Sequence, residues 1–251
     1  MLNKFFTFLN LVNFYGMKHL LVLDIETVPQ CSSFFQLNPY WQELWCDKIS
    51  KTMPENFSPE NSYLQRASIM AEFGKIICIS TGVFYEDKGN RQCFKLKSLA
   101  GDNETEILQQ FVDLINTYSR LHKDFQFAGH NIKEFDIPYI CRRLVINNMN
   151  LPDYLQLSGK KPWETQMTDT LQLWKFGDYK HYTSLKLLAA CLGIDTPKED
   201  MDGSMVREVY YEQNDLPRIT EYCQKDVITV AQILLRLQNL PIMPVENIFV
   251  V

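Results

Sequence analysis

The sequence predicts an α/β fold in which helices flank a central mixed β-sheet. Short apolar runs that are typical of buried strands alternate along the chain with longer segments of helical periodicity. The chain has 251 residues, of which 46% are hydrophobic and 22% charged, so it can bury a sizeable core. No internal repeat, low-complexity segment or long linker divides the sequence. We therefore expect a single domain built from alternating strands and helices.

Four segments have the pattern of strands. The run HLLVL at 19–23 ends at Asp24 and is apolar throughout, which is typical of a strand buried on both faces. Segments 75–85 and 91–99 are joined by a polar turn, and 125–131 is the fourth strand. Three strands, a helix, a strand and further helices follow one another, and this order predicts a mixed sheet.

Seven segments have the pattern of helices. The longest, 216–238, places Ile219, Cys223 and Val227 on one face. Another begins at Asp136 with proline in its first turn, which is a helix-start signal. The full set is 39–50, 59–72, 104–121, 136–148, 183–194, about 204–213 and about 216–238, and a loop is expected at 150–168.

Residues 17–240 form the expected domain, which contains one insertion and is flanked by an extension and a tail. Four prolines mark 28–72 as an insertion after the first strand. Residues 1–16 form an N-terminal extension, for which a true start at Met17 and a weak secretory signal are both interpretations. The signal interpretation lacks a small-residue cleavage pattern. Residues 241–251 are expected to be a C-terminal tail.

The charge and cysteine content exclude several classes of protein. Thirty acidic and 25 basic residues give a net charge of −5, which argues against a non-specific nucleic-acid coat but not against an enzyme that grips one end. The seven cysteines include no C-x-x-C pair, so we expect neither a zinc ribbon nor thioredoxin-type chemistry, and a reduced, cytoplasmic compartment is favoured. The longest apolar runs are too short to span a membrane, so no membrane partner is expected.

Two acids, Asp24 and Glu26, end the first strand. Because side chains alternate along a strand, both point to the same face, where two carboxylates repel unless a divalent cation lies between them. Carboxylate oxygens suit Mg²⁺ or Mn²⁺. The same spacing recurs at Asp102 and Glu104, but those acids open a helix, and the helix dipole explains them.

A second polar pattern runs from Asn131 to Asp136 and links a strand to a helix. Loops at the carboxyl ends of strands are where α/β sheets commonly build sites. The alternative interpretation is that Asp136 only caps the helix, although capping does not prevent it from also facing a metal.

A third pattern, Tyr222 and Asp226, places two polar side chains one turn apart on the last helix. The alternative is a hydrogen bond within the edge of the core. Tyr211 and Asp215 have the same spacing, but Asp215 is the expected N-cap of that helix, so this pair is discounted.

In order and spacing, these three patterns resemble the motifs of the DEDD superfamily of ribonuclease H-like 3′–5′ exonucleases. The motifs are D-x-E at Asp24 and Glu26, N-x-x-x-[FY]-D ending at Asp136, and Y-x-x-x-D at Tyr222 and Asp226. The tyrosine is typical of the DEDDy branch. The chain is similar to the proofreading domain of family B DNA polymerases over about residues 18–240, without a polymerase module. The resemblance implies a ribonuclease H-like fold with a central mixed β-sheet flanked by helices.

The resemblance also implies a hydrolase that uses two divalent cations, Mg²⁺ or Mn²⁺, and releases nucleoside 5′-monophosphates. It implies that Asp24 bridges both cations, that Glu26 and Asp226 hold the cation carrying the attacking water, and that Asp136 supports the other. Tyr222 would orient the water, because a tyrosine with an unperturbed pKa of about 10 is a poor base at neutral pH.

The expected partner is the 3′ end of single-stranded DNA. Asn131, Phe135 and His130 are the expected substrate-binding residues, with Phe135 stacking on an unpaired base. For His130, a structural hydrogen bond is favoured over metal ligation. Further candidates, each equally explained by a solvated surface or by core packing, are Lys160, Lys161, Lys175, Lys180, His181, Trp174, Tyr179 and Tyr182.

Two alternative functions stay open at this stage. A 3′–5′ exoribonuclease would use the same carboxylates, because the sequence does not identify the groups that would meet a ribose 2′-hydroxyl. A catalytically idle nucleic-acid-binding module would keep the fold without the chemistry, although all four carboxylates and the tyrosine are present. No pattern identifies a replication or repair partner.

Overall fold

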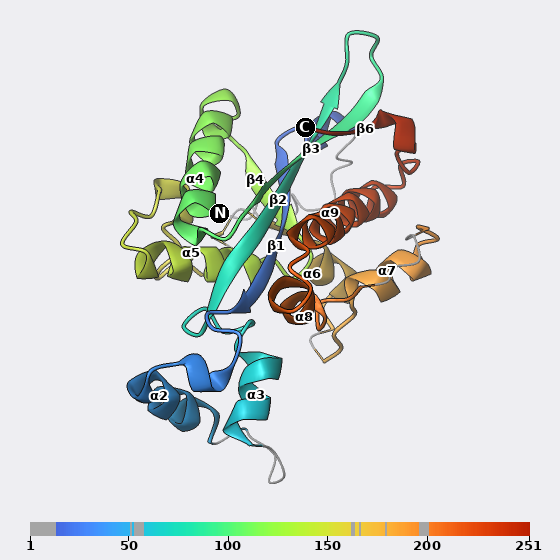
Figure 1. Ribbon diagram of the computed structural model, residues 1–251. Helices are drawn as coiled ribbons and strands as arrows, with labels where there is room; N and C mark the ends of the chain where they lie inside the picture. The colour runs from blue at the N-terminus through green and yellow to red at the C-terminus, as the bar shows by residue number, and fades with distance from the viewer. Residues whose placement is uncertain are drawn as a thin grey trace.

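A six-stranded mixed sheet forms the centre of the computed structural model, which describes residues 14–50, 52, 58–161, 164–165, 167–178, 180–195 and 201–251 (Figure 1). The strand order is β5-β4-β1-β2-β3-β6. The strands are β1 (Leu20–Pro29), β2 (Gly74–Glu86), β3 (Gln92–Ala100), β4 (Gln126–Gly129), β5 (Met167–Asp169) and β6 (Ile248–Val250). β1, β2 and β3 pair antiparallel, whereas β4 is parallel to β1 and β5 to β4. The predicted α/β architecture, a central mixed sheet flanked by helices, is confirmed.

Helices cover both faces of this sheet. α4 (Glu104–Leu121) and α5 (Asp136–Ile146) lie on one side, and α9 (Leu216–Leu237) lies on the other (Figure 1). The alternation of β1 explains the division, because Leu21 and Leu23 join the cluster of α4 and α5, whereas Leu20 and Val22 join that of α9. Burial on both faces, predicted from the run at 19–23, is confirmed. The remaining helices are α1 (Phe14–Met17), α2 (Pro39–Ile49), α3 (Pro59–Arg66), α6 (Thr170–Lys175), α7 (Leu185–Cys191) and α8 (Val206–Tyr211).

The central strand β1 is longer than predicted. It continues past Asp24 to Pro29, and a register shift in its pairing with β2 lies between Glu26 and Thr27. The sequence suggested an end at the first acid because buried strands rarely contain carboxylates. Asp24 and Glu26 therefore lie within a strand whose backbone is paired with β2 at both acids, whereas the pairing with β4 ends at Val22.

The connection from β1 to β2 contains a small helical unit, which lies beyond the end of the sheet in Figure 1. It comprises a short 3₁₀ turn (Phe34–Gln36), α2 and α3, which pack around Trp45, Tyr63 and Phe73. The helix predicted over 59–72 ends early, at Arg66. The Trp45 indole N–H donates to the carbonyl of Pro59, so this unit has an internal core of its own.

The chain ends differ from the sequence expectation. Phe14 of α1 packs edge-to-face against Phe84 at 5.7 Å, so this part of the expected extension belongs to the core. Residues 1–13 of that extension lie outside the described residues. In the expected tail, β6 pairs with β3. β5, β6 and α6 were missed because elements of three to six residues are too short to show a period.

A buried ion pair fixes α5 against α4 and β2. The Arg143 guanidinium donates to Glu104 at 2.8 Å through Nε and to the carbonyl of Ala71 through a terminal nitrogen. Glu104 also accepts from the backbone N–H of Ile76 and from the amide of Asn147. Because α5 begins at Asp136, this network sets where that carboxylate enters the site. Among the described residues, no helix combines the length and apolar character needed to cross a bilayer.

Replacing Arg143 should expose how much this network contributes. Arg143→Met leaves the Glu104 carboxylate buried without its counter-charge, so the free energy of unfolding should fall by about 3–5 kcal/mol in urea titrations. Arg91→Met is the matched control, because it breaks the exposed pair with Asp87 and should have a far smaller effect. Equal losses in the two variants would contradict this account.

Candidate active site

The first motif faces α9. Asp24 is half-buried and Glu26 is only 7% exposed. The Cys223 thiol of α9 donates to the Asp24 backbone carbonyl at 3.5 Å and to its Oδ2 at 3.4 Å. A carboxylate oxygen of each acid and the Cys223 sulfur lie within 4.8 Å of one another. Strand and helix are therefore in direct contact at these acids.

The second motif brings Asp136 onto the same strand. The loop after β4 turns at Asn131, whose φ of 61° is left-handed, and the N–H of Phe135 donates to the Asn131 carbonyl. Asp136, 3% exposed, is the first residue of α5. The backbone N–H groups of Asp136 itself and of Ile25 lie close enough to its carboxyl to act to lower its pKa. Asp136 therefore docks on β1 at the residue between Asp24 and Glu26.

The third motif completes the group from α9. Tyr222 and Asp226 are both half-buried and lie one turn apart. The Asp226 charge acts to raise the pKa of Asp24, Glu26 and Asp136 alike, which places it within electrostatic reach of all three. The Tyr222 ring packs against the cluster that contains Val28 and Ile219. The structure thus brings the four carboxylates of the three motifs together.

Burial and mutual repulsion raise the pKa values of Asp24, Glu26 and Asp136. Burial, followed by the neighbouring charges, raises the pKa of Asp24 and Glu26 well above the usual range. Burial also raises the pKa of Asp136 to about 7, although the two backbone N–H groups near it oppose the shift. Among the described residues, no lysine or arginine is a cause of the shifts at Asp24, Glu26 or Asp136. Carboxylate oxygens gathered in this way fit hard divalent cations.

Asp169 is a buried acid that sequence reasoning missed. It is 2% exposed at the end of β5, and it accepts hydrogen bonds from the backbone N–H groups of Asn131, Lys133, Leu171 and Gln172. The side chain therefore caps α6 and holds the loop of the second motif at once. The only signal in the sequence was an Asp next to Thr170 at a helix start, inside a segment where no strand was expected.

The three expected substrate-binding residues lie in or beside this loop, but they differ in how far hydrogen bonds and packing fix their side chains. Both ring nitrogens of His130 are engaged, with the Thr170 hydroxyl and the Thr183 carbonyl at 2.9 Å each. Burial lowers the pKa of His130, so the ring is neutral at neutral pH. A neutral ring with both nitrogens hydrogen-bonded has a structural role, which agrees with the prediction of a structural hydrogen bond. The Asn131 side-chain oxygen is buried and has no hydrogen-bond partner among the described residues. Phe135 is half-buried beside Asp136, with its ring 5.5 Å from that of Tyr139.

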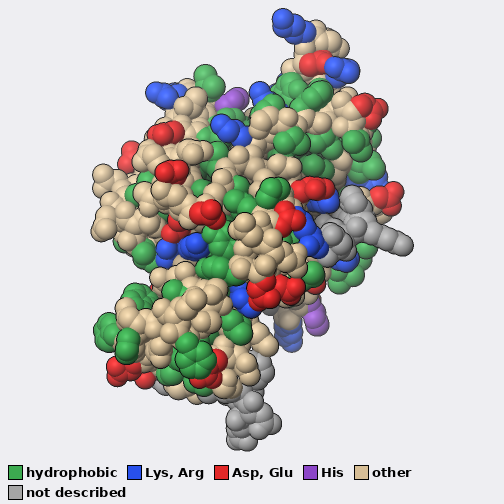
Figure 2. Space-filling view, viewed as in Figure 1, with side chains coloured by type: hydrophobic (Ala, Val, Ile, Leu, Met, Phe, Trp, Pro, Cys, Tyr) green, Lys and Arg blue, Asp and Glu red, His purple; other side chains and the backbone are tan. Residues whose placement is uncertain are grey.

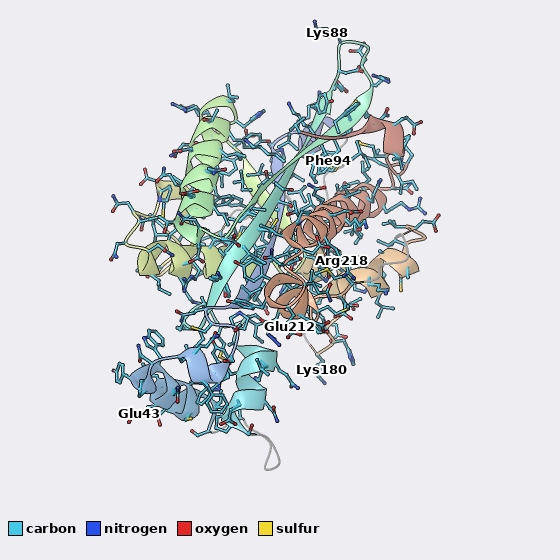
Figure 3. The ribbon with its side chains drawn as sticks, in the orientation of Figure 1. Glu43, Lys88, Phe94, Lys180, Glu212 and Arg218 are labelled. Atoms are coloured by element: carbon cyan, nitrogen blue, oxygen red, sulfur yellow. The ribbon has the colours of Figure 1, made fainter. Side chains whose placement is uncertain are left out.

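Among the further candidates, Tyr182 lies nearest the carboxylates. It is 66% exposed, and the charges of Asp136 and Asp169 add to the burial that raises its pKa. Lys180 projects from the loop between α6 and α7 (Figure 3). Trp174 packs into the apolar cluster of α7, and Tyr179 lies outside the described residues. The exposed side chains of Lys160, Lys161 and His181 have no described contact with the four carboxylates.

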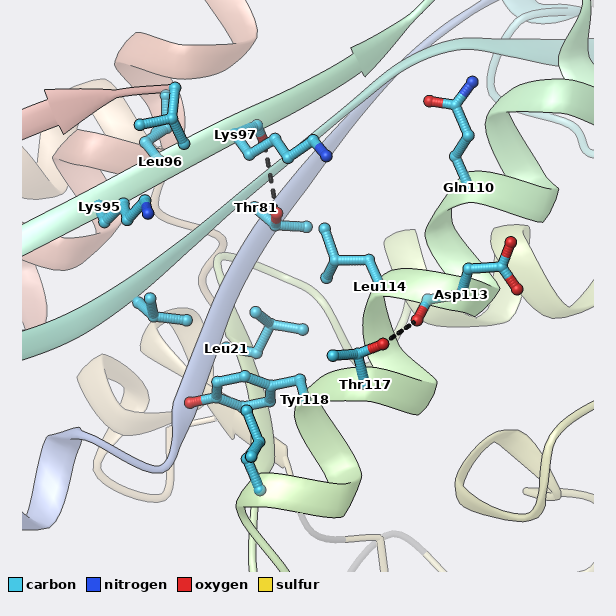
Figure 4. Close-up of a pocket in the computed structure, with 13 residues that line it drawn as sticks. Leu21, Thr81, Lys95, Leu96, Lys97, Gln110, Asp113, Leu114, Thr117 and Tyr118 are labelled. Atoms are coloured by element: carbon cyan, nitrogen blue, oxygen red, sulfur yellow. Dashed lines mark hydrogen bonds between the residues drawn. The ribbon is translucent and has the colours of Figure 1, made fainter.

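A separate groove of about 660 Å³ lies on the opposite face of the sheet (Figure 4). Leu21 and Val83 of the sheet and Leu114 and Tyr118 of α4 line it, together with Lys97 of β3. Because Asp24 and Glu26 face α9, the sheet separates this groove from the carboxylates, and we assign it no part in their chemistry.

Comparison with known proteins gives a family. A family model described as a predicted 3′–5′ exonuclease related to the exonuclease domain of PolB matches residues 67–242, which include the second and third motifs but not the first. A family B DNA polymerase from the hyperthermophilic archaeon Pyrobaculum calidifontis matches 86% of this chain with 14% identity and a TM-score of 0.45. This chain covers 24% of that polymerase chain. None of the curated proteins matches.

The raised pKa of Asp136 predicts a pH effect in the metal-free protein. An aspartate that titrates near 4 when unfolded and at about 7 when folded binds its proton more tightly in the folded state, so stability falls as pH rises between these values. In EDTA, urea titrations should show a loss of about 4 kcal/mol from this group between pH 4 and 8. Asp136→Asn should reduce the loss.

Two comparisons control this measurement. Asp47→Asn changes an exposed acid on α2 and should keep the wild-type pH dependence. Excess Mg²⁺ should restore wild-type stability at pH 8, because a bound cation stabilises the ionised carboxylates. Identical pH profiles for wild type and Asp136→Asn would show that this carboxylate does not carry the effect.

Proposed function

The chain belongs to the family of predicted 3′–5′ exonucleases related to the exonuclease domain of PolB, and we propose that it hydrolyses single-stranded DNA from the 3′ end with two divalent cations. The observation that carries this proposal is the convergence of Asp24, Glu26, Asp136 and Asp226 from three separate elements. Isolated acids have simpler structural explanations, but Asp24, Glu26 and Asp136 all have raised pKa values, and the charge of Asp226 contributes to each shift, so bound divalent cations would stabilise their ionised forms.

The four carboxylates have different positions relative to one another, which supports different roles. Asp24 lies on the central strand and interacts with all three other acids, so it is suited to bridge two cations. Glu26 and Asp226 interact directly and would hold one of the cations, whereas Asp136, close to the Ile25 N–H, would support the other. When bound, the cations supply a water of lowered pKa and neutralise the charge on the scissile phosphate.

Tyr222 is suited to orient the attacking water. Its position one turn before Asp226 places its hydroxyl on the helix face that carries the carboxylate. It lines a polar cavity of about 490 Å³ together with Arg218 and Lys225. A tyrosine is too weak a base for proton abstraction at neutral pH, so its contribution is geometric.

The protein carries a net charge of −5, so it does not attract a nucleic acid through its overall charge. Contacts close to the site must therefore hold the DNA strand. On the face shown in Figure 2, acidic and basic side chains are interspersed over the surface. The exposed ring of Tyr182 and the half-buried ring of Phe135 flank Asp136 and offer stacking surfaces for unpaired bases. Stacking is tolerant of sequence, which suits an enzyme that removes successive nucleoside 5′-monophosphates.

The test is degradation of a 5′-labelled single-stranded DNA with Mg²⁺ or Mn²⁺, beside an RNA of the same sequence. The expected result is a ladder that shortens from the 3′ end and disappears with EDTA. Asp24→Ala should lower the rate at least about 100-fold, because it removes the central ligand. Asp102→Ala is the matched control: it belongs to the other D-x-E pair, and its exposed carboxylate accepts from the Tyr210 hydroxyl, away from the four carboxylates of the motifs.

Each outcome of this assay has a defined meaning. Faster degradation of the RNA would show that RNA rather than DNA is the substrate, with the same hydrolytic chemistry. No cleavage of either polymer by folded wild-type protein, at any concentration of either cation, would overturn the proposed activity.

The water-positioning role of Tyr222 predicts a change in kcat rather than in KM. Tyr222→Phe removes one hydrogen bond to the reacting water and should lower kcat about tenfold to a hundredfold. Tyr211→Phe is the control, because that hydroxyl donates to the Pro29 carbonyl and has no part in the site. A tenfold rise in KM with unchanged kcat would assign Tyr222 to substrate binding instead.

A further inference from the structure

Cys223 lies within the carboxylate group, and the proposed hydrolysis does not use it. The residue is fully buried on α9, between Tyr222 and Asp226 in the sequence. Its thiol donates to Asp24 Oδ2 at 3.4 Å, and its sulfur lies within 4.8 Å of carboxylate oxygens of both Asp24 and Glu26. The site therefore offers one soft and two hard ligand atoms.

The spacing of these atoms suits one small cation. Zinc bonds of about 2.3 Å to sulfur and about 2.0–2.2 Å to oxygen, at tetrahedral angles, give a sulfur–oxygen separation of about 3.5–3.6 Å. The separation of the Cys223 sulfur and Asp24 Oδ2 is 3.4 Å. This edge of a tetrahedral site is thus present already, and only the Glu26 side chain needs to move closer.

Glu26 supplies an independent observation. Its side chain is 93% buried, since 7% is exposed, and it accepts no hydrogen bond from the described part of the chain. Among the neighbouring charges, that of Asp226 raises the pKa of Glu26 most, so the two carboxylates repel each other. A buried carboxylate with unused oxygen lone pairs, close to a thiol and a second carboxylate, has the arrangement of a metal ligand.

Cys78 on β2 is a second thiol close to Cys223. It pairs with Glu26 across the β1–β2 register, and its thiol is close enough to that of Cys223 for each to influence the pKa of the other. Its sulfur also lies 3.8 Å from the Ser80 hydroxyl. Cys78 therefore lies next to the proposed ligands, where neighbouring polar groups commonly orient the ligands of a metal site.

We propose that Asp24, Glu26 and Cys223 bind a thiophilic divalent cation such as Zn²⁺ or Cd²⁺, in competition with the hard cations at the same carboxylates. Binding forms a metal–sulfur bond and releases the thiol proton to water, without electron transfer. Thiolate selects such cations over Mg²⁺. The consequence rests on the proposed function: a four-coordinate site that engages Asp24 prevents it from bridging two hard cations, so these cations inhibit hydrolysis.

Cadmium titration of the full-length protein tests the binding directly. A cadmium–thiolate bond has an ultraviolet charge-transfer band, which should appear with wild type and be lost in Cys223→Ser. The affinity for Cd²⁺ should fall at least about tenfold in that variant, whereas the affinity for Mg²⁺ should change far less. Cys46→Ser and Cys191→Ser change more accessible thiols on α2 and α7, and both should keep the wild-type band.

A second variant covers the case in which Cys223→Ser does not fold, as judged by circular dichroism. Glu26→Gln keeps the thiol and should also weaken Cd²⁺ binding. A band that survives Cys223→Ser, or a Cd²⁺ affinity unchanged by Glu26→Gln, would overturn the proposal. Because the band does not depend on hydrolysis, its absence in an active nuclease overturns only this site. A strong band in a protein that degrades no polymer overturns only the proposed function.

Discussion

Repulsion among buried carboxylates is the constraint on which the candidate site depends. Asp24, Glu26 and Asp136 all have raised pKa values, and the charge of Asp226 reaches each of them. In water, such acids would separate, and in a flexible protein they would turn outward to be solvated. They stay together only because the surrounding structure leaves them no other position. The rigidity of the sheet and its helices is therefore a requirement for the chemistry as well as a property of the fold.

The structure meets this requirement by anchoring each acid through its backbone. β1 is paired on both sides by β2 and β4, and its flanking residues are buried on both faces. Asp136 is held at the first turn of α5, whose other end is fixed by the Glu104–Arg143 network, and its carboxyl lies close to the Ile25 N–H. α9 holds Asp226 through a long apolar stripe against the same sheet. Stability created in the core thus offsets the cost of holding like charges together, which is the usual relation between a strained site and its scaffold.

Much of this arrangement could be predicted from the sequence, because long elements have clear periods and the motif residues follow them. The central strand, the hairpin, α4 and α9 were placed correctly to within a few residues. The prediction of β1 stopped at Asp24, since apolar periodicity ends at an acid even when the backbone pairing continues. β5 and β6 have three residues each, and only their long-range partners β4 and β3 define them. Asp169 was missed for the same reason: its four N–H donors come from two segments that meet only in the fold.

The contrast among buried acids shows what distinguishes a structural carboxylate from a reactive one. Glu104, Asp169 and Glu26 are almost equally buried, so burial alone does not separate them. Glu104 is paired with Arg143, and Asp169 accepts four backbone N–H groups, so each is satisfied by the protein itself. Glu26 has neither a cation nor a described donor, and its neighbours are other acids and thiols. The number of donors that face a buried carboxylate therefore separates these roles, and of these three the one with the fewest, Glu26, lies where the three motifs meet.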